Sequence, residues 1–209
     1  MSNTERTTSH MIVPYVTQWT AEQDGGYELV ERESIGLAYA DENIMDRDEH
    51  GVLWRRTPSR PGHGRPIFGM VHSLRQRRAM RRLLCQVCGE PASWTEDGVL
   101  WLLRDFRDDW PNWPENLAAT EPPVCTPCAH KAVRLCPALR KGAAVIRVGR
   151  CPIVGVYGAL YRVEGRRIIT HGDESIAYDD PSIRWMRATK LVRELHDCTL
   201  VTLDGLPQT

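Results

Sequence analysis

Two pairs of cysteines, each with the spacing Cys-x-x-Cys, constrain this chain more than any other feature. The first pair is Cys85 and Cys88, followed directly by Gly89, and the second pair is Cys125 and Cys128. Two cysteines separated by two residues can reach one ion because the backbone turns back between them, and zinc takes four such ligands in a tetrahedron. The spacing therefore predicts one Zn²⁺ site that is built from all four thiolates.

The remaining cysteines favour a metal site over a framework of disulfides. The chain has seven cysteines, and its first ten residues lack the apolar stretch of a secretory signal. We therefore expect a cytoplasmic protein with reduced thiols. A redox Cys-x-x-Cys motif and unligated thiols are the alternatives, and His130 or Cys136 could replace one ligand. A site closed by four cysteines leaves no position for water, so the predicted zinc is structural rather than catalytic.

The segment around the cysteines has the pattern of a known type of zinc module. Asp97-Gly98 lies between two apolar stretches and predicts a hairpin, while Gly89 suits the tight turn of a zinc knuckle. The second cysteine pair opens a predicted helix, whose apolar residues repeat every three to four positions up to Pro137. A knuckle, a hairpin and a helix that supplies the last two ligands resemble the treble-clef zinc modules. The resemblance covers residues 81–139 and no more of the chain.

Treble-clef modules also form the scaffold of HNH nucleases, in which histidines of the hairpin and helix hold a catalytic metal. No histidine occurs between Cys88 and Cys125 in this chain. The resemblance therefore implies the scaffold and a structural zinc without the nuclease chemistry.

The formal net charge of the chain is zero, but the charges are unevenly distributed along it. The net charge is −8 over residues 1–50, +8 over 51–90, −5 over 91–124, +8 over 125–170 and −3 over 171–209. Alternation of this kind indicates either a basic binding face or parts of one fold that neutralise each other.

Residues 73–84 predict an amphipathic helix with arginines on one side and apolar residues such as Ala79 and Met80 on the other. The arginines expected to contact phosphate groups are Arg75, Arg77, Arg78, Arg81 and Arg82. The Pro/Gly-rich loop before the helix adds Arg55, Arg56, Arg60 and Arg65. A solvated surface helix without a ligand is the alternative.

The overall pattern predicts an α+β fold. We expect four regions: an N-terminal β-rich region of antiparallel strands (1–54), a basic Pro/Gly loop (55–68), the Arg-rich helix plus zinc module (69–142) and a small C-terminal α+β unit (143–209). The expected strands cover residues 12–19, 27–31, 35–40, 143–148, 153–163, 168–170 and 199–203, and a helix is expected over 181–195. The longest uncharged apolar run, residues 151–161, is too short to cross a bilayer, so no membrane partner is expected.

These patterns favour a zinc-stabilised nucleic-acid-binding protein in which the Arg-rich helix contacts DNA or RNA. The alternative is a protein–protein interaction adaptor, in which the zinc module and the Trp/Pro-rich segment 108–123 hold a partner protein. An enzyme with an unrecognised site is a third class. Four tryptophans near the cysteines either stack on bases or pack in the core: Trp94, Trp101, Trp110 and Trp113. The sequence predicts no oligomeric state.

Overall fold

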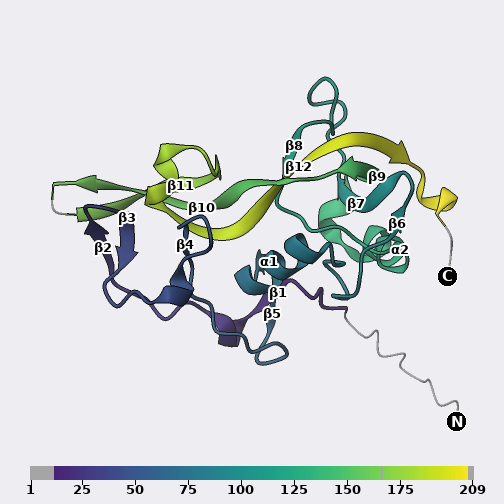
Figure 1. The fold of residues 1–209 in the computed structure, drawn as a ribbon. Helices are drawn as coiled ribbons and strands as arrows, with labels where there is room; N and C mark the ends of the chain where they lie inside the picture. Colours follow the sequence, from purple (N-terminus) through teal and green to yellow (C-terminus); the bar gives the residue numbers. More distant parts are fainter. Residues whose placement is uncertain (1–11, 166, 207–209) are drawn as a thin grey trace, which may run out of the picture.

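The structure, a computed structural model, describes residues 12–165 and 167–206 (Figure 1). Its two helices are α1 (Ser73–Arg82) and α2 (Thr126–Leu135). The strands are β1 (Thr17–Trp19), β2 (Leu29–Arg32), β3 (Gly36–Tyr39), β4 (Leu53–Trp54), β5 (Pro66–Val71), β6 (Trp94–Thr95), β7 (Gly98–Arg104), β8 (Leu117–Ala119), β9 (Ala143–Arg150), β10 (Ile153–Glu164), β11 (Arg167–Ala177) and β12 (Met186–Val201). The predicted mixture of strands and helices is confirmed.

The long strand β12 is the spine of the molecule. Eight strands form one sheet in the order β11-β10-β12-β9-β7-β6, and β4 and β8 also pair with β12. The first half of β12 pairs with β10, and its last residues, from His196 to Val201, pair with β9. In Figure 1 this strand arches from the β10–β11 end of the molecule to the end that holds β6, β7, β9 and α2. A single strand thus joins the two ends of the fold.

Strand β7 is buried on both faces, which explains its unbroken apolar sequence. Its odd-numbered residues, including Trp101 and Leu103, pack with Trp113 in one core. Leu100 and Leu102 point to the other face and pack in a second core with residues of α2 and the cysteine region. The sheet therefore lies between two apolar layers at this end of the molecule.

The N-terminal strands predicted at 27–31 and 35–40 form the antiparallel hairpin β2–β3. The strand predicted at 12–19 is shorter than expected, because only β1 pairs in a ladder, with β5. Before it, the backbone N–H of Tyr15 donates to the carbonyl oxygen of Val87 at 2.8 Å. The residues just before β1 thus contact the segment that carries the first cysteine pair, a contact that no sequence pattern indicated.

The helix predicted over residues 181–195 is wrong. Pro181–Trp185 forms a short 3-10 helix, and the rest of that stretch belongs to β12. The region after residue 142 contains no α-helix in its described part, so the predicted C-terminal α+β unit is instead built from strands and 3-10 turns. The strands predicted at 143–148, 153–163 and 168–170 are confirmed as β9, β10 and β11, each longer than expected. The division into four regions stays a prediction.

No helix in residues 12–165 and 167–206 combines the length and the apolar character needed to cross a membrane.

Candidate metal centre

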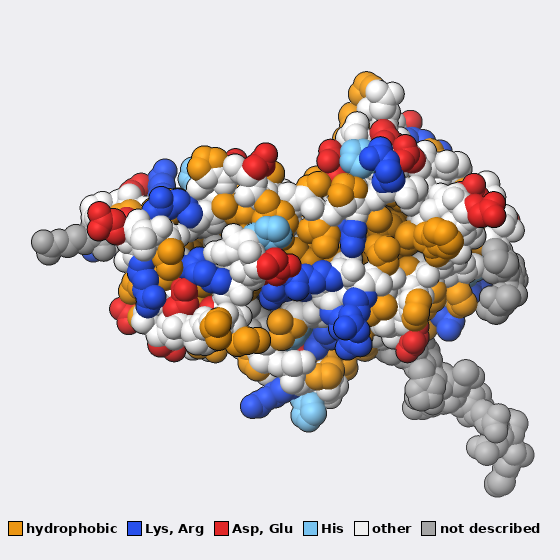
Figure 2. Space-filling view, viewed as in Figure 1, with side chains coloured by type: hydrophobic (Ala, Val, Ile, Leu, Met, Phe, Trp, Pro, Cys, Tyr) orange, Lys and Arg blue, Asp and Glu red, His pale blue; other side chains and the backbone are white. Residues whose placement is uncertain are grey.

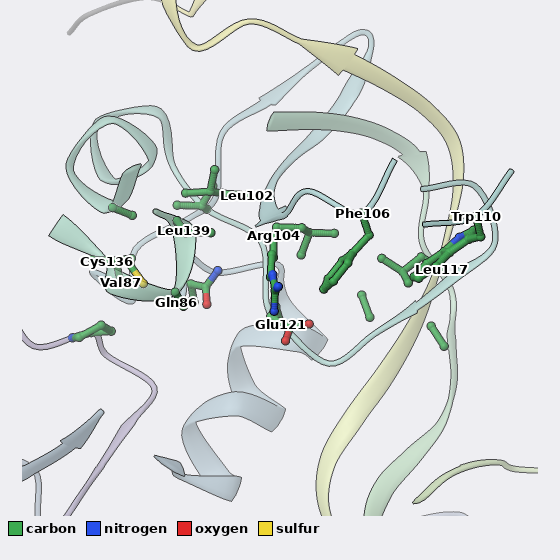
Figure 3. A pocket seen from close by; sticks show the side chains of 17 residues that line it. Gln86, Val87, Leu102, Arg104, Phe106, Trp110, Leu117, Glu121, Cys136 and Leu139 are labelled. Atoms are coloured by element: carbon green, nitrogen blue, oxygen red, sulfur yellow. The ribbon is translucent and has the colours of Figure 1, made fainter. Parts of the chain in front are cut away.

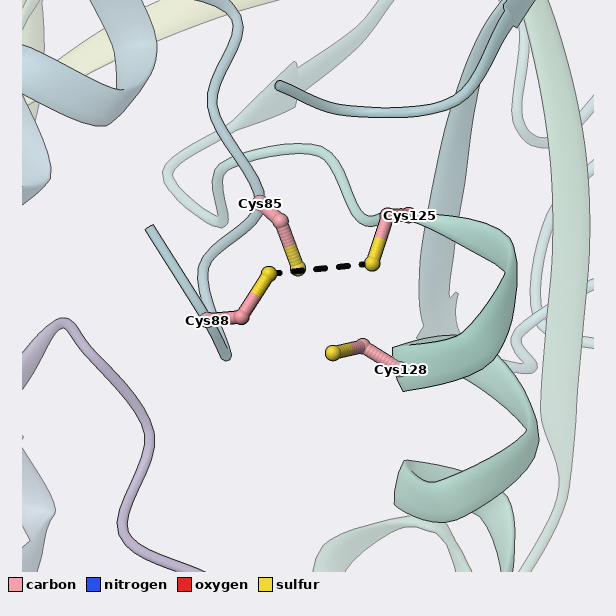
Figure 4. A group of neighbouring side chains, drawn as sticks. All are labelled: Cys85, Cys88, Cys125 and Cys128. Atoms are coloured by element: carbon pink, nitrogen blue, oxygen red, sulfur yellow. Dashed lines mark hydrogen bonds between the residues drawn. The ribbon is translucent and has the colours of Figure 1, made fainter. Parts of the chain in front are cut away.

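The structure brings the two cysteine pairs together. The four sulfur atoms of Cys85, Cys88, Cys125 and Cys128 all lie within 4.8 Å of one another. Figure 4 shows the first two side chains reaching in from a loop and the last two from the start of α2, with the Sγ atoms of Cys88 and Cys125 3.7 Å apart. The predicted cluster is confirmed as a group that could hold a metal ion.

The first pair lies on a tight turn that follows α1. The backbone N–H of Cys85 donates to the carbonyl oxygen of Glu90 at 2.7 Å, and Gly89 N–H donates to the Cys85 carbonyl oxygen at 2.9 Å. The N–H of Val87 points at the Cys85 sulfur, 3.4 Å away. Amide groups that point at the sulfur atoms stabilise thiolates, as in a zinc knuckle. Backbone hydrogen bonds alone therefore hold this loop in a conformation that points the cysteine side chains at the cluster.

Gly89 is required at this turn for two reasons. Its φ angle is +79°, a conformation that other residues rarely adopt. A Cβ atom at this position would also lie 2.9 Å from the Tyr15 ring. The glycine after the first cysteine pair was singled out in the sequence, whereas the tyrosine that covers it was not.

The second pair is positioned by the start of α2. Cys125 is the N-cap residue and Cys128 lies in the first turn, where the positive end of the helix dipole favours negative thiolates. The hydroxyl of Thr126 donates to the Ser93 hydroxyl at 3.0 Å, which ties this turn to the segment leading into the β6–β7 hairpin. The helix ends at Leu135, before Pro137, as its apolar repeat predicted.

The electrostatics of the cluster disfavour four thiolates without a counter-charge. Burial raises the pKa of the Cys128 thiol above its ordinary range, and the neighbouring sulfur atoms raise it further. Sulfur atoms this close cannot all carry a negative charge unless a positive ion lies between them. The thiols either stay protonated or share a bound divalent metal ion, and the spacing of the four sulfur atoms is one that could hold such an ion.

The two alternative ligands lie outside the cluster. Among the residues that the structure describes, the group contains the four cysteines and neither His130 nor Cys136. Cys136 is the C-cap residue of α2 and lines a groove described below. The four-cysteine set therefore needs no substitute.

The five arginines of α1 do not form one exposed face. Arg75 is buried, and its guanidinium donates to both carboxylate oxygens of Glu22 at 2.8 and 2.7 Å. The guanidinium of Arg77 stacks on the Trp54 ring, with its central carbon 3.8 Å from the ring centroid. Part of the predicted arginine side is therefore covered, because Glu22 and the Trp54 ring of the N-terminal region pack against α1.

The other three arginines of α1 are exposed. Arg81 pairs with Glu49 at 2.7 Å, whereas Arg78 and Arg82 form no ion pair within the described residues. Figure 2 shows Lys and Arg side chains gathered in the middle of this face, where Figure 1 places α1. A reduced basic patch thus remains on this side of the molecule.

Two of the four loop arginines are also paired. Arg55 lies 3.2 Å from the Asp24 carboxylate, and Arg56 contacts the carboxylates of both Asp41 and Asp46. Arg60 and Arg65 are exposed.

The four tryptophans separate into two classes. Trp101 and Trp113 belong to the core, with Trp113 only 6% exposed. Trp94 is 70% exposed, and Trp110 is 42% exposed. Core packing, one of the two predicted roles, therefore holds for Trp101 and Trp113 only.

A groove of about 350 Å³ lies beside the metal centre. One wall comes from α2 and the turn after it, through Ala132, Cys136 and Leu139. The opposite wall comes from the connection that follows β7 and from the Trp/Pro-rich segment, including the start of β8. Its residues include Phe106, Trp110 and Leu117. Figure 3 shows Leu102 and Leu139 on one side of Arg104, and Phe106, Leu117 and Trp110 on the other. No sequence spacing signals this groove, because the residues of its two walls lie far apart in the sequence and come together only in the fold.

Comparison with known proteins found no family model, no curated protein and no solved structure that matches this chain.

Proposed function

We propose that the chain is a zinc-stabilised protein-interaction module that binds partner proteins in the groove beside the four-cysteine centre. The observation that carries the proposal is the groove itself, an apolar cleft with the exposed ring of Trp110 on its wall. Exposed apolar clefts with aromatic side chains are typical binding surfaces for protein ligands.

The metal supports the binding surface directly. Helix α2 supplies Cys125 and Cys128 to the cluster with its first turn, and Ala132 and Cys136 to the groove wall with later turns. Binding of the ion fixes the start of the helix and thereby the wall. Zinc is the ion that four thiolates in a closed tetrahedral site favour, and such a site is structural.

Nucleic-acid binding is the second candidate function. The exposed side chains of Arg78 and Arg82, which form no ion pair with any described residue, favour it, together with Arg60 and Arg65 on the preceding loop. It ranks second because Arg75, Arg77 and Arg81 are engaged inside the fold or with Glu49. The treble-clef resemblance stays a proposal and favours neither candidate.

The test is a selection from a displayed library of random ten-residue peptides against the zinc-loaded full chain. We expect enriched peptides whose affinity falls at least tenfold in Trp110→Ala. The matched control is Trp94→Ala, which removes a more exposed tryptophan that does not line the groove.

Two results would contradict the proposal. One is a selection that enriches no peptide. The other is binding to mixed-sequence DNA or RNA that falls steeply with salt and is lost in an Arg78→Ala/Arg82→Ala variant, which would make the second candidate the function.

A further inference from the structure

The groove contains an open edge of the sheet. The odd-numbered residues of strand β7 direct their backbone N–H and C=O groups to β9. The bond that continues this ladder shows it: the N–H of Asp105 donates to the Gly142 carbonyl oxygen at 3.2 Å. Even-numbered residues of β7 therefore direct their backbone groups away from β9. Leu100 does so: its N–H donates to the Ser93 carbonyl oxygen at 2.9 Å, and its carbonyl oxygen accepts from Val124 N–H at 2.8 Å.

Beyond Leu100, the edge of β7 that faces away from β9 has no neighbouring strand among the described residues. Leu102 and Arg104 direct their N–H and C=O groups to this edge, and no hydrogen bond within residues 12–165 and 167–206 reaches these four groups. The neighbouring segment cannot extend the ladder with its own N–H groups, because Pro122 and Pro123 precede Val124 and proline has none. The last part of β7, from Leu102 to Arg104, is therefore an open edge of the sheet.

The open edge coincides with the apolar groove. Leu102 and Arg104 line it, and the two walls rise on opposite faces of the sheet. Successive side chains of an added strand would point alternately to the two faces. One set would meet Ala132 and Leu139 at α2, and the other would meet Leu117 and Trp110.

The charges near the groove are asymmetric. Residues 125–141 contain no Asp or Glu and four cations, all exposed and none in an ion pair within the described part of the chain: Lys131, Arg134, Arg140 and Lys141. The opposite side carries the exposed carboxylates of Asp108 and Asp109. The α2 side is therefore the side that favours an acidic ligand.

We infer that the groove takes an extended peptide segment of a partner protein, which adds as a strand to the edge of β7 at Leu102 and Arg104. The segment has apolar side chains at alternate positions and an acidic residue towards α2. Up to four backbone hydrogen bonds hold it, and the two walls select its side chains. This inference rests on the proposed function and specifies its mode of binding.

The first experiment measures amide hydrogen exchange by NMR in the free, zinc-loaded full chain. The amides of Leu102 and Arg104 exchange at least tenfold faster than those of Trp101 and Leu103, which bond to β9. Equal protection of all four amides would show that the edge is already covered and would overturn the inference. Protection that rises with protein concentration, together with a dimer in sedimentation, would assign the edge to a second copy and would overturn it as well.

The second experiment adds a synthetic peptide from the library selection. The Leu102 and Arg104 amides become at least tenfold more protected, and N-methylation of the peptide backbone weakens binding at alternate residues. Peptides that depend on Trp110 but leave these amides unprotected would overturn the strand addition and leave the proposed function standing. A selection without any binder, combined with fast exchange at the edge, would refute the proposed function and the inference together.

A matched pair of variants separates the contribution of the Arg104 backbone N–H to binding from that of its side chain. Arg104→Pro removes the N–H that faces the groove without breaking a bond to β9, and Arg104→Ala removes the same side chain but keeps that N–H. Affinity for the selected peptide falls about tenfold more in the proline variant than in the alanine variant, which matches the loss of one hydrogen bond. Equal affinities in two variants with the same melting temperature would overturn the inference.

Discussion

The two helices show how differently positive charge can be used in one fold. Helix α1 carries five arginines, and α2 carries only Lys131 and Arg134. In α1 the carboxylates of Glu22 and Glu49 take two of the arginines and the Trp54 ring takes a third, whereas the two cations of α2 are exposed and unpaired among the described residues. The number of cations on a helix therefore says less about binding than the position of the carboxylates around it.

The ion pairs decide between the two interpretations of the charge pattern for part of the chain. The acidic residues 1–50 supply carboxylate partners to four arginines of the basic residues 51–90. These pairs are Glu22 with Arg75, Asp24 with Arg55, Asp41 and Asp46 with Arg56, and Glu49 with Arg81. Neutralisation within the fold thus accounts for much of the first basic block. Residues 125–141, part of the second block, have no such partners within the described residues.

The largest expected effect concerns α2, which carries two of the four cysteines. Cys128→Ser removes one of four ligands, and because structural zinc stabilises such a module by about 10 kcal/mol or more, we expect loss of the metal and a melting temperature lower by roughly 10 °C or more. Elemental analysis and a thermal melt measure both. Cys136→Ser, on the same helix but outside the cluster, retains one metal ion per chain; metal loss in both variants would refute the ligand assignment.

The next effect separates the two tryptophans of the Trp/Pro-rich segment. Trp113→Ala leaves a cavity in a core and lowers the free energy of unfolding by about 3–5 kcal/mol. Trp110→Ala, at the groove, lowers it by less than about 1 kcal/mol. Urea unfolding of both variants measures the difference, and equal losses would show that Trp110 is part of the core rather than of a binding surface.

The buried end of α1 gives a pH-dependent prediction. Burial by itself raises the pKa of Glu22, but hydrogen bonds from Arg75 and from the backbone N–H groups of Trp19 and Arg60 outweigh it and lower the pKa from 4.5 to about 2. A carboxylate whose pKa is lowered on folding stabilises the protein above pH 4.5, and this stabilisation is lost as the pH falls towards 2. The loss amounts to about 3 kcal/mol.

Glu22→Gln tests this prediction because it removes the titrating group. The variant is less stable than the parent at pH 7 by about 3–5 kcal/mol, since Arg75 keeps a buried charge without a carboxylate. Its stability varies less between pH 4.5 and 2, which urea unfolding at a series of pH values measures. A variant with the same acid sensitivity as the parent would exclude Glu22 as the responsible group.

The smallest effect belongs to the exposed end of α1. Arg78→Ala/Arg82→Ala changes the free energy of unfolding by no more than about 0.5 kcal/mol, because neither side chain forms an ion pair in the described residues. If the patch binds nucleic acid, the slope of log affinity against log salt concentration falls by about 2. A loss of stability as large as that of Glu22→Gln would show that these arginines, too, are needed inside the fold.

The four-cysteine site could be predicted from the sequence because its information is local. Each pair lies on one turn, and Gly89 and Pro127 mark those turns. The buried pair of Glu22 and Arg75 could not be predicted, since the two residues are 53 positions apart and no spacing links them.

The error in β12 has a local physical cause. Met186 and Ala188 are buried with a period of two, as in a regular strand. The register with β10 then shifts by one residue, because Thr189 has no partner between the paired residues Ala188 and Lys190. The next buried apolar residue is therefore Leu191 rather than residue 190. Spacings such as 186, 191 and 195 imitate a helix, so a β-bulge inside a strand defeats an argument from periodicity.

The central claim, that four cysteines hold a zinc ion and position the groove wall, is tested most directly by X-ray absorption at the zinc edge of the purified full chain. We predict one zinc per chain with four sulfur neighbours at about 2.3 Å. A chain without zinc, or a shell in which nitrogen replaces one of the sulfur atoms, would contradict the account.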